Sequence, residues 1–191
     1  MPTHEAASTL ARYARGCIRE ALGGASVPPP HGAVYDEPGA AFVSLHAPNG
    51  RLQGCIGTLE PHQSLVEDVA HNARAAAFHD PRGSHLLLDD VDALEVEVTV
   101  LGPLEPVTAT DEASACAAFR PGVDGVVFAW GGRRATFIPQ MWRHFPDAHA
   151  LLAELKQKAG LPADFWAPDV ELWRYTAVVA TDRPPPLMER A

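Results

Sequence analysis

Cysteine is scarce in this sequence, and its few copies lie far apart. The 191 residues include three cysteines, Cys17, Cys55 and Cys116, with no CxxC pair and no spacing typical of a zinc finger. So few cysteines exclude the disulfide framework of a small secreted domain. We therefore expect free thiols in a reducing compartment and predict a cytoplasmic protein.

Clustered positive charge and long apolar runs are also missing. The formal net charge is -9 and no cluster of Lys and Arg occurs. The sequence therefore predicts no basic surface that could bind the phosphates of a nucleic acid. No run of about 18 apolar residues is present, and the N-terminal stretch lacks the basic start and apolar centre of a secretory signal. We expect a soluble protein that binds neither nucleic acid nor a membrane.

Histidine is plentiful, but its spacing does not indicate a local metal site. The nine histidines form no HxH, HxxxH or HExxH pattern. The closely spaced pair His144 and His149 would point to different sides of a helix. The sequence predicts no cofactor and no metal ligands, although histidines distant in sequence could still converge.

Periodicity predicts an α+β fold with a largely antiparallel sheet, formed by two hairpins and a C-terminal strand and packed with about four helices. Hairpin-then-helix order at 41–78 and again at 126–159 suggests an internal duplication whose halves share one sheet. We expect a single domain over 1–191, with its core at about 8–180 and a Pro-rich tail at 181–191. Helices are expected at 5–22, 64–78, 111–119 and 151–159, and strands at 41–47, 51–56, 94–100, 126–130, 134–138 and 170–179.

Cys55 is the residue most suggestive of chemistry, because it stands between Gly54 and Gly57 on a predicted strand. If Asn49-Gly50 forms a two-residue hairpin loop, the strand register is determined. Ser44 then lies opposite Cys55, His46 lies opposite Gln53, and the thiol faces the polar side of the sheet with Ser44, His46 and Arg51.

This arrangement leaves three interpretations of Cys55 open. A thiolate is a strong nucleophile, and His46 could accept its proton, which makes the pair a candidate catalytic centre. The thiol could instead contact a ligand or react reversibly without turnover. It could also be a small residue that simply fits a tight strand, as we expect for Cys17 and Cys116 in the core.

Four further residues are candidates for ligand binding. Asp80 and Arg82 follow the helix that begins with the Ser64–Glu67 capping box, and a loop clamp is the simpler interpretation. Asp124, between two glycines, most simply caps a turn. Arg134, beside the second hairpin turn, could hold a carboxylate or phosphate.

The tryptophans are expected to differ in exposure. Trp142, Trp166 and Trp173 are interpreted as packed residues. Trp130, beside the second turn, is predicted to be exposed and to contact a partner, with Arg133 next to it.

The order of several motifs resembles the AMMECR-type domain family, which in prokaryotes includes protein A of the AmmeMemoRadiSam system. The resemblance covers about residues 8–180. Gln53 stands where the family usually has Arg, and Gly83 stands where it usually has Phe. The motifs are 52–57 (LQGCIG), 77–82 (AFHDPR), the strand ending at Leu101, 121–125 (PGVDG), 137–142 (FIPQMW) and 158–161 (KAGL).

The resemblance implies a two-lobed α+β fold and an intracellular role beside a Memo-type, extradiol-dioxygenase-like protein and a radical-SAM protein. We expect a cleft between the lobes to present Cys55 to a small molecule or a modified side chain. The alternative is a non-catalytic scaffold that docks onto those partners. Cys55 and His46 are the candidate catalytic residues, and the candidate substrate-binding residues are Ser44, Arg51, Gly54, Gly57, Asp80, Arg82, Asp124 and Arg134.

Overall fold

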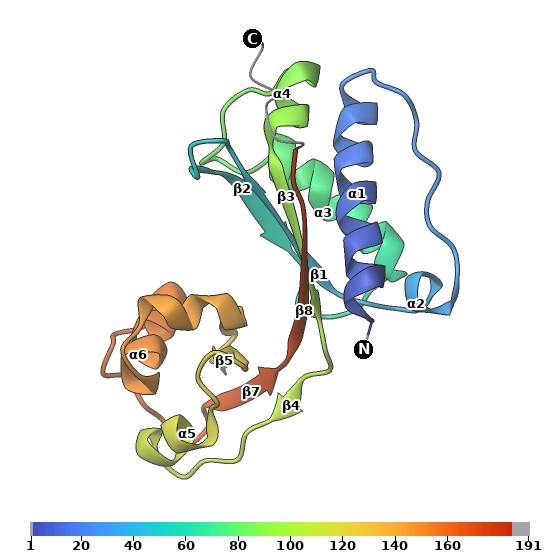
Figure 1. The fold of residues 1–191 in the computed structure, drawn as a ribbon. Helices are drawn as coiled ribbons and strands as arrows, with labels where there is room; N and C mark the ends of the chain where they lie inside the picture. Colours follow the sequence, from blue (N-terminus) through green and yellow to red (C-terminus); the bar gives the residue numbers. More distant parts are fainter. Residues whose placement is uncertain (1, 185–191) are drawn as a thin grey trace. The chain divides into compact units, whose positions relative to one another are not determined.

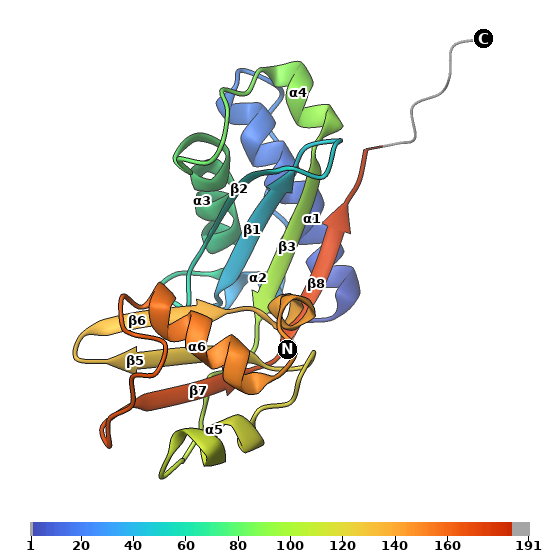
Figure 2. The same cartoon turned by 90° about the vertical axis from the view of Figure 1, so that its left-hand side faces the viewer.

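The computed structural model describes residues 2–184 and divides into two compact units. Of the described residues, the first unit contains 2–101 and 178–184, and the second contains Gly102–Ala177. Each unit has its own four-stranded sheet (Figures 1 and 2). The predicted α+β class with antiparallel hairpins is confirmed, but the expectation of one shared sheet is wrong.

The first sheet has the strand order β2-β1-β3-β8. β1 pairs antiparallel with both β2 and β3, and β2 is an edge strand. Helices α1 and α3 cover one face of this sheet (Figure 1). The elements are α1 (His4–Ala21), α2 (Ala33–Asp36), β1 (Ala41–His46), β2 (Leu52–Gly57), α3 (Leu65–Phe78), α4 (Leu88–Ala93), β3 (Glu95–Leu101) and β8 (Ala177–Asp182).

The sequence explains the two main helices of this unit. In α1, small and apolar residues such as Leu10, Ala14 and Ile18 recur at helical spacing and are fully buried. Helix α3 follows Ser64, and Glu67 Oε2 accepts hydrogen bonds from the Ser64 amide and hydroxyl at 3.3 and 2.7 Å. The predicted capping box is confirmed.

The second sheet has the strand order β4-β7-β5-β6. Leu151, Leu152 and Leu155 of helix α6 are fully buried against Val126 and Phe128 of β5, and α6 lies over this sheet in Figure 2. The elements are β4 (Glu105–Pro106), α5 (Glu112–Ala118), β5 (Gly125–Trp130), β6 (Arg133–Phe137), the 3-10 helix η1 (Pro139–His144), α6 (Ala148–Lys158) and β7 (Glu171–Tyr175).

The end of the chain differs from the prediction. We expected one closing strand at 170–179, but the segment forms β7 in the second sheet and β8 in the first. β8 runs to Asp182, into the stretch expected to begin the Pro-rich tail, and the Asp182 side chain pairs with Arg15 at 2.5 Å. Residues 185–191 of that tail lie outside the described residues. No helix within residues 2–184 combines the length and apolar character needed to cross a membrane.

Candidate functional site

The hairpin places Cys55 opposite Ser44, as the sequence predicts. Leu45 pairs with Gly54 and Val43 with Ile56 in the same register. Val43 and Leu45 are fully buried in the core under the helices. Because successive strand residues point to opposite faces, Ser44 and Cys55 lie on the face of the sheet that is turned away from that core.

The register changes near the turn, where the prediction is wrong. His46 pairs with Leu52 and not with Gln53, because the ladder is interrupted between Leu45 and His46. The turn is one residue longer than expected: the Ala47 amide donates to Arg51 O at 2.9 Å, and Gly50 adopts φ +78°. Such three-residue loops commonly place a bulge in the following strand.

The Cys55 thiol is hydrogen-bonded to Ser44 on the neighbouring strand. Ser44 Oγ lies 3.2 Å from Cys55 Sγ and donates a hydrogen bond to it. Ser44 is buried and Cys55 is half-buried. His46 follows Ser44 on the same face of β1 and is half-buried, but no hydrogen bond joins His46 to Cys55 in the part of the chain that the structure describes.

Asp80 and Arg82 hold the backbone of Cys55 on the free edge of β2. The Cys55 amide donates to Asp80 Oδ2 at 2.8 Å, and Arg82 Nη2 donates to Cys55 O at 3.3 Å. The two side chains pair with each other, with Arg82 Nη2 2.6 Å from Asp80 Oδ2. They supply the donor and acceptor that a neighbouring strand would otherwise provide. We call this arrangement the Asp80–Arg82 clamp, and it confirms the predicted local clamp.

The two side chains of the clamp differ strongly in burial. The Asp80 side chain is 1% exposed, whereas that of Arg82 is 59% exposed. Hydrogen bonds from Arg82, together with the amides of Cys55 and Arg82, hold the pKa of Asp80 well below its usual range, against the opposing effect of burial. The same pairing raises the pKa of Arg82. Asp80 is therefore a fixed anion that is hydrogen-bonded to the Cys55 backbone amide.

The flanking glycines are required by packing. A Cβ at Gly54 would overlap the carbonyl oxygen of Ala76 in α3, and a Cβ at Gly57 would overlap the Phe42 ring. Helix α3 can therefore lie directly against β2 at Gly54, which places the loop after the helix beside Cys55. Both glycines thus have structural roles, and substrate contact by either remains a prediction.

Gln53 and Gly83, the two departures from the expected family pattern, lie against each other. A Cβ at Gly83 would overlap the backbone oxygen of Gln53. The Gln53 side chain is buried, donates from Nε2 to Ser84 O at 2.5 Å and accepts from Ser84 Oγ at 3.0 Å. Arg51 Nη2 also donates to Gln53 Oε1 at 3.3 Å. Arg51 is therefore directed toward the loop that carries the clamp.

Asp124 and Arg134 belong to the second unit, apart from the other predicted site residues. Asp124 is fully buried and accepts hydrogen bonds from the Arg120 amide at 2.8 Å and from Arg120 Nη2 at 2.6 Å. This confirms its role as a turn cap. The Arg134 guanidinium carbon lies 5.3 Å from the centre of the Trp173 ring. The cleft expected between the lobes stays a prediction.

Two further predictions concern the other thiols and Trp130. Cys17 and Cys116 are buried, as expected, and burial raises the pKa of both, to about 11 for Cys116. The expected exposure of Trp130 is wrong. Its ring is half-buried and lies 4.5 Å from that of Phe165, and its Nε1 donates to Asp169 Oδ1 at 2.8 Å, because the side chain packs over the second core.

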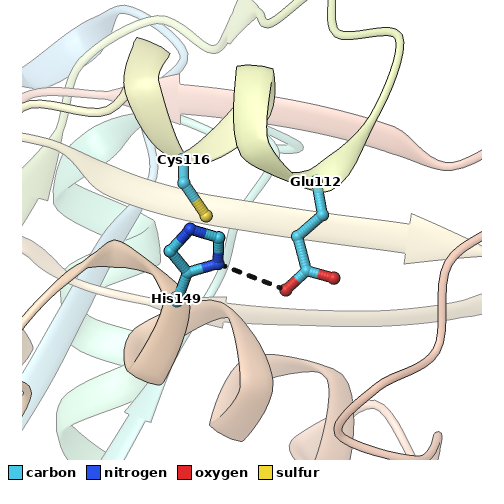
Figure 3. A group of neighbouring side chains, drawn as sticks. All are labelled: Glu112, Cys116 and His149. Carbon is cyan, nitrogen blue, oxygen red and sulfur yellow. Dashed lines mark ion pairs between the residues drawn. The ribbon is translucent and has the colours of Figure 1, made fainter.

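One cluster was missed at the sequence level. Glu112, Cys116 and His149 bring a carboxylate, a thiol and an imidazole together between α5 and α6 (Figure 3). The four-residue spacing of Glu112 and Cys116 on one helix was the available signal. His149 comes from another helix, so no local pattern includes all of them.

Cys55 therefore lies on the edge strand of a small α+β unit, beside a helix that packs directly on that strand. Comparison with known proteins then assigns the chain. A sequence model of the AMMECR1 family matches residues 11–180. The chain therefore belongs to the AMMECR1 family.

Relatives in this family align along nearly the whole chain. The chain is 33% identical over 181 residues to Protein MJ0810 of Methanocaldococcus jannaschii, which covers 93% of this chain and 90% of that protein. It is 34% identical over 176 residues to a protein of Methanothermobacter thermautotrophicus, with 90% and 91% covered. The crystal structure of the uncharacterized protein PH0010 from Pyrococcus horikoshii matches with a TM-score of 0.84 at 32% identity, covering 93% of this chain and 92% of that one.

Proposed function

We propose that Cys55 is the functional centre of this protein, a thiol that reacts with, or directly contacts, a small molecule or a modified side chain. The observation that carries this proposal is the Asp80–Arg82 clamp, which binds both the amide and the carbonyl of Cys55. Reactive groups work best when their supporting residues are themselves held in place. Here a buried carboxylate supports a half-buried thiol.

The hydrogen bond from Ser44 supports thiol chemistry at this position. Ser44 Oγ donates to the Cys55 sulfur at 3.2 Å and so holds the thiol, whose thiolate is the nucleophilic form of cysteine, in a defined position on the sheet face. The other two cysteines are buried, and burial raises the pKa of each; for Cys17 it does so in spite of a hydrogen bond with the Tyr13 hydroxyl. Cys55 is thus the thiol best placed for reaction.

His46 is the proposed proton acceptor. It shares the sheet face of Ser44 and is half-buried, which leaves its ring partly accessible to a reactant. Catalytic hydrogen bonds are often formed only when substrate is bound. We propose that His46 accepts the proton of Cys55 once a substrate lies on this face.

The proposed setting is a modification pathway shared with a Memo-type and a radical-SAM protein, as the family resemblance implies. In this setting the protein would act as a thiol enzyme or a thiol carrier. The scaffold alternative relied on Trp130 and Arg133 as docking residues. Both are engaged within their own unit, since Arg133 Nη1 donates to Gly160 O and Trp130 bonds Asp169.

The test compares Cys55→Ser with Cys17→Ser in cells that contain both partner proteins. We expect Cys55→Ser to abolish the modification made by the pathway, while Cys17→Ser leaves it intact and both variants stay folded by circular dichroism. A pull-down of the two partners is measured in parallel. Retained modification in Cys55→Ser, together with retained association, would support a scaffold and contradict a thiol function.

A further inference from the structure

The cluster in the second unit joins two helices through three side chains of metal-binding type. Glu112 and Cys116 stand one helical turn apart on α5, and His149 lies in the first turn of α6. One ligand atom from each residue lies within 4.8 Å of the other two. In Figure 3 the His149 ring lies between the Cys116 sulfur and the Glu112 carboxylate.

The ligand atoms stand somewhat farther apart than they would around a bound ion. His149 Nδ1 is 3.8 Å from Glu112 Oε1. Ligands at about 2.0 to 2.3 Å from a tetrahedral zinc ion stand roughly 3.5 Å from one another. His149 is exposed on the helix surface, so small rotations of its side chain can close the remaining difference.

A buried lysine orients the carboxylate. Lys156 is fully buried, and its Nζ donates to Glu112 Oε2 at 3.0 Å. The other oxygen, Oε1, is the one directed toward His149. Carboxylates that bind metals are commonly held by such a second hydrogen bond, which leaves one oxygen for the ion. The positive charge of Lys156 disfavours binding of a cation here. The negative charge of Asp147, which is near enough to raise the pKa of Cys116, favours it.

We propose that Glu112, Cys116 and His149 bind a zinc ion that links α5 to α6. Sulfur and imidazole nitrogen with one carboxylate oxygen suit zinc, whereas calcium and magnesium prefer oxygen ligands throughout. Three protein ligands leave a fourth position for water on the exposed side of His149. This site is independent of Cys55 and of the function proposed above.

Cobalt provides the direct test, because it occupies zinc sites and absorbs when bound to a thiolate. The full chain, purified without a histidine tag and stripped with a chelator, is titrated with Co²⁺ and then with Zn²⁺. We expect one ion per chain, a thiolate-to-cobalt charge-transfer band, and displacement of cobalt by zinc. Absence of binding would overturn the proposal. Binding of several ions per chain, as expected for scattered surface histidines, would overturn it as well.

Variants assign the ligands. Cys116→Ser should abolish the charge-transfer band, and His149→Ala and Glu112→Gln should each weaken Zn²⁺ binding at least tenfold. His144→Ala and Cys55→Ser are the matched controls and should bind as wild type does; His144 is an exposed histidine of the same unit. Because His149 is exposed, His149→Ala should fold normally even if Cys116→Ser does not. Unweakened binding in His149→Ala would refute the site.

Discussion

Replacing Asp80 by Asn removes the charge that stabilises the Cys55 backbone. The Asp80 carboxylate accepts from the Cys55 amide at 2.8 Å, and from Arg82 Nε at 2.9 Å and Nη2 at 2.6 Å. The asparagine amide group keeps one acceptor oxygen and presents an NH₂ group where the second oxygen was. Because Oδ2 accepts from the Cys55 amide and Oδ1 accepts from the Arg82 amide, one of these two backbone amides faces the NH₂ group in either orientation and loses its partner.

The expected cost follows from which group is left unpaired. The Arg82 guanidinium is largely exposed and can be solvated by water. Loss of its hydrogen bonds to Asp80 therefore changes the free energy of unfolding little. The amides of Cys55 and Arg82 both donate to a nearly fully buried carboxylate, and an unpaired buried amide costs about 1 to 3 kcal/mol. We expect Asp80→Asn to lower the free energy of unfolding by about 2 kcal/mol, in the middle of that range.

The effect should also depend on pH. The pKa of Asp80 is held far below its unfolded value, so the folded state favours the charged form. Its stabilisation is complete above about pH 4 and declines by at most about 1.4 kcal/mol per pH unit below that. The stability difference between wild type and Asp80→Asn should therefore shrink as the pH falls from 4 to 3, in line with the same linkage.

Urea unfolding followed by far-ultraviolet circular dichroism measures the loss, and hydrogen exchange of the Cys55 and Arg82 amides locates it. The control is Asp92→Asn, because Asp92 pairs with Arg19 on the surface of the same unit and is 60% exposed. Such an exposed pair contributes at most about 1 kcal/mol. If Asp80→Asn and Asp92→Asn were equally stable, with unchanged exchange at Cys55 and Arg82, the role assigned to the clamp would be wrong.

Other residues give independent predictions. Gly54→Ala should destabilise the first unit by about 1 to 3 kcal/mol in urea unfolding, because the new methyl group overlaps the Ala76 carbonyl; wild-type stability would contradict this contact. Trp142→Phe should cost about 1 to 3 kcal/mol, since it leaves the Asp124 carbonyl without the indole donor now at 2.6 Å; tryptophan fluorescence, which reports the second unit, measures it. Burial raises the pKa of Tyr175 to about 12 from 10.0, so stability should fall between these pH values, and Tyr175→Phe should flatten that fall.

The local features of the hairpin could be predicted from sequence. Alternation and a turn signal placed Ser44 opposite Cys55, because side chains on a strand repeat every second residue. The bulge could not be predicted, since Asn49-Gly50 is compatible with a two-residue or a three-residue loop. That one residue separates His46 from its predicted partner.

Contacts between distant segments could not be predicted in the same way. Asp80 was recognised as a clamp, but its partner is the Cys55 amide, a whole helix away in sequence. Likewise, β7 and β8 were predicted as one strand because only Thr176 separates them. Which sheet each strand joins is decided by hydrogen bonds to remote strands, and local periodicity carries no signal for these.

The same limit applies to the second unit. Glu112 and Cys116 share a helical face, which is visible in the sequence, but His149 reaches them only through the packing of α6 on α5. Trp130 was misplaced because a residue beside a turn is usually exposed, whereas here Phe165 and Asp169 cover it. Neither neighbour could be identified from spacing.

The central claim is that Cys55 is the reactive thiol of this protein. Site-resolved alkylation measures it most directly: the native protein is treated with a small alkylating agent, and mass spectrometry follows modification of Cys17, Cys55 and Cys116 over time. We predict that Cys55 is modified first and much faster than the two buried cysteines, and that Ser44→Ala slows its reaction. Modification of Cys55 at the rate of Cys17 or Cys116 would contradict the account.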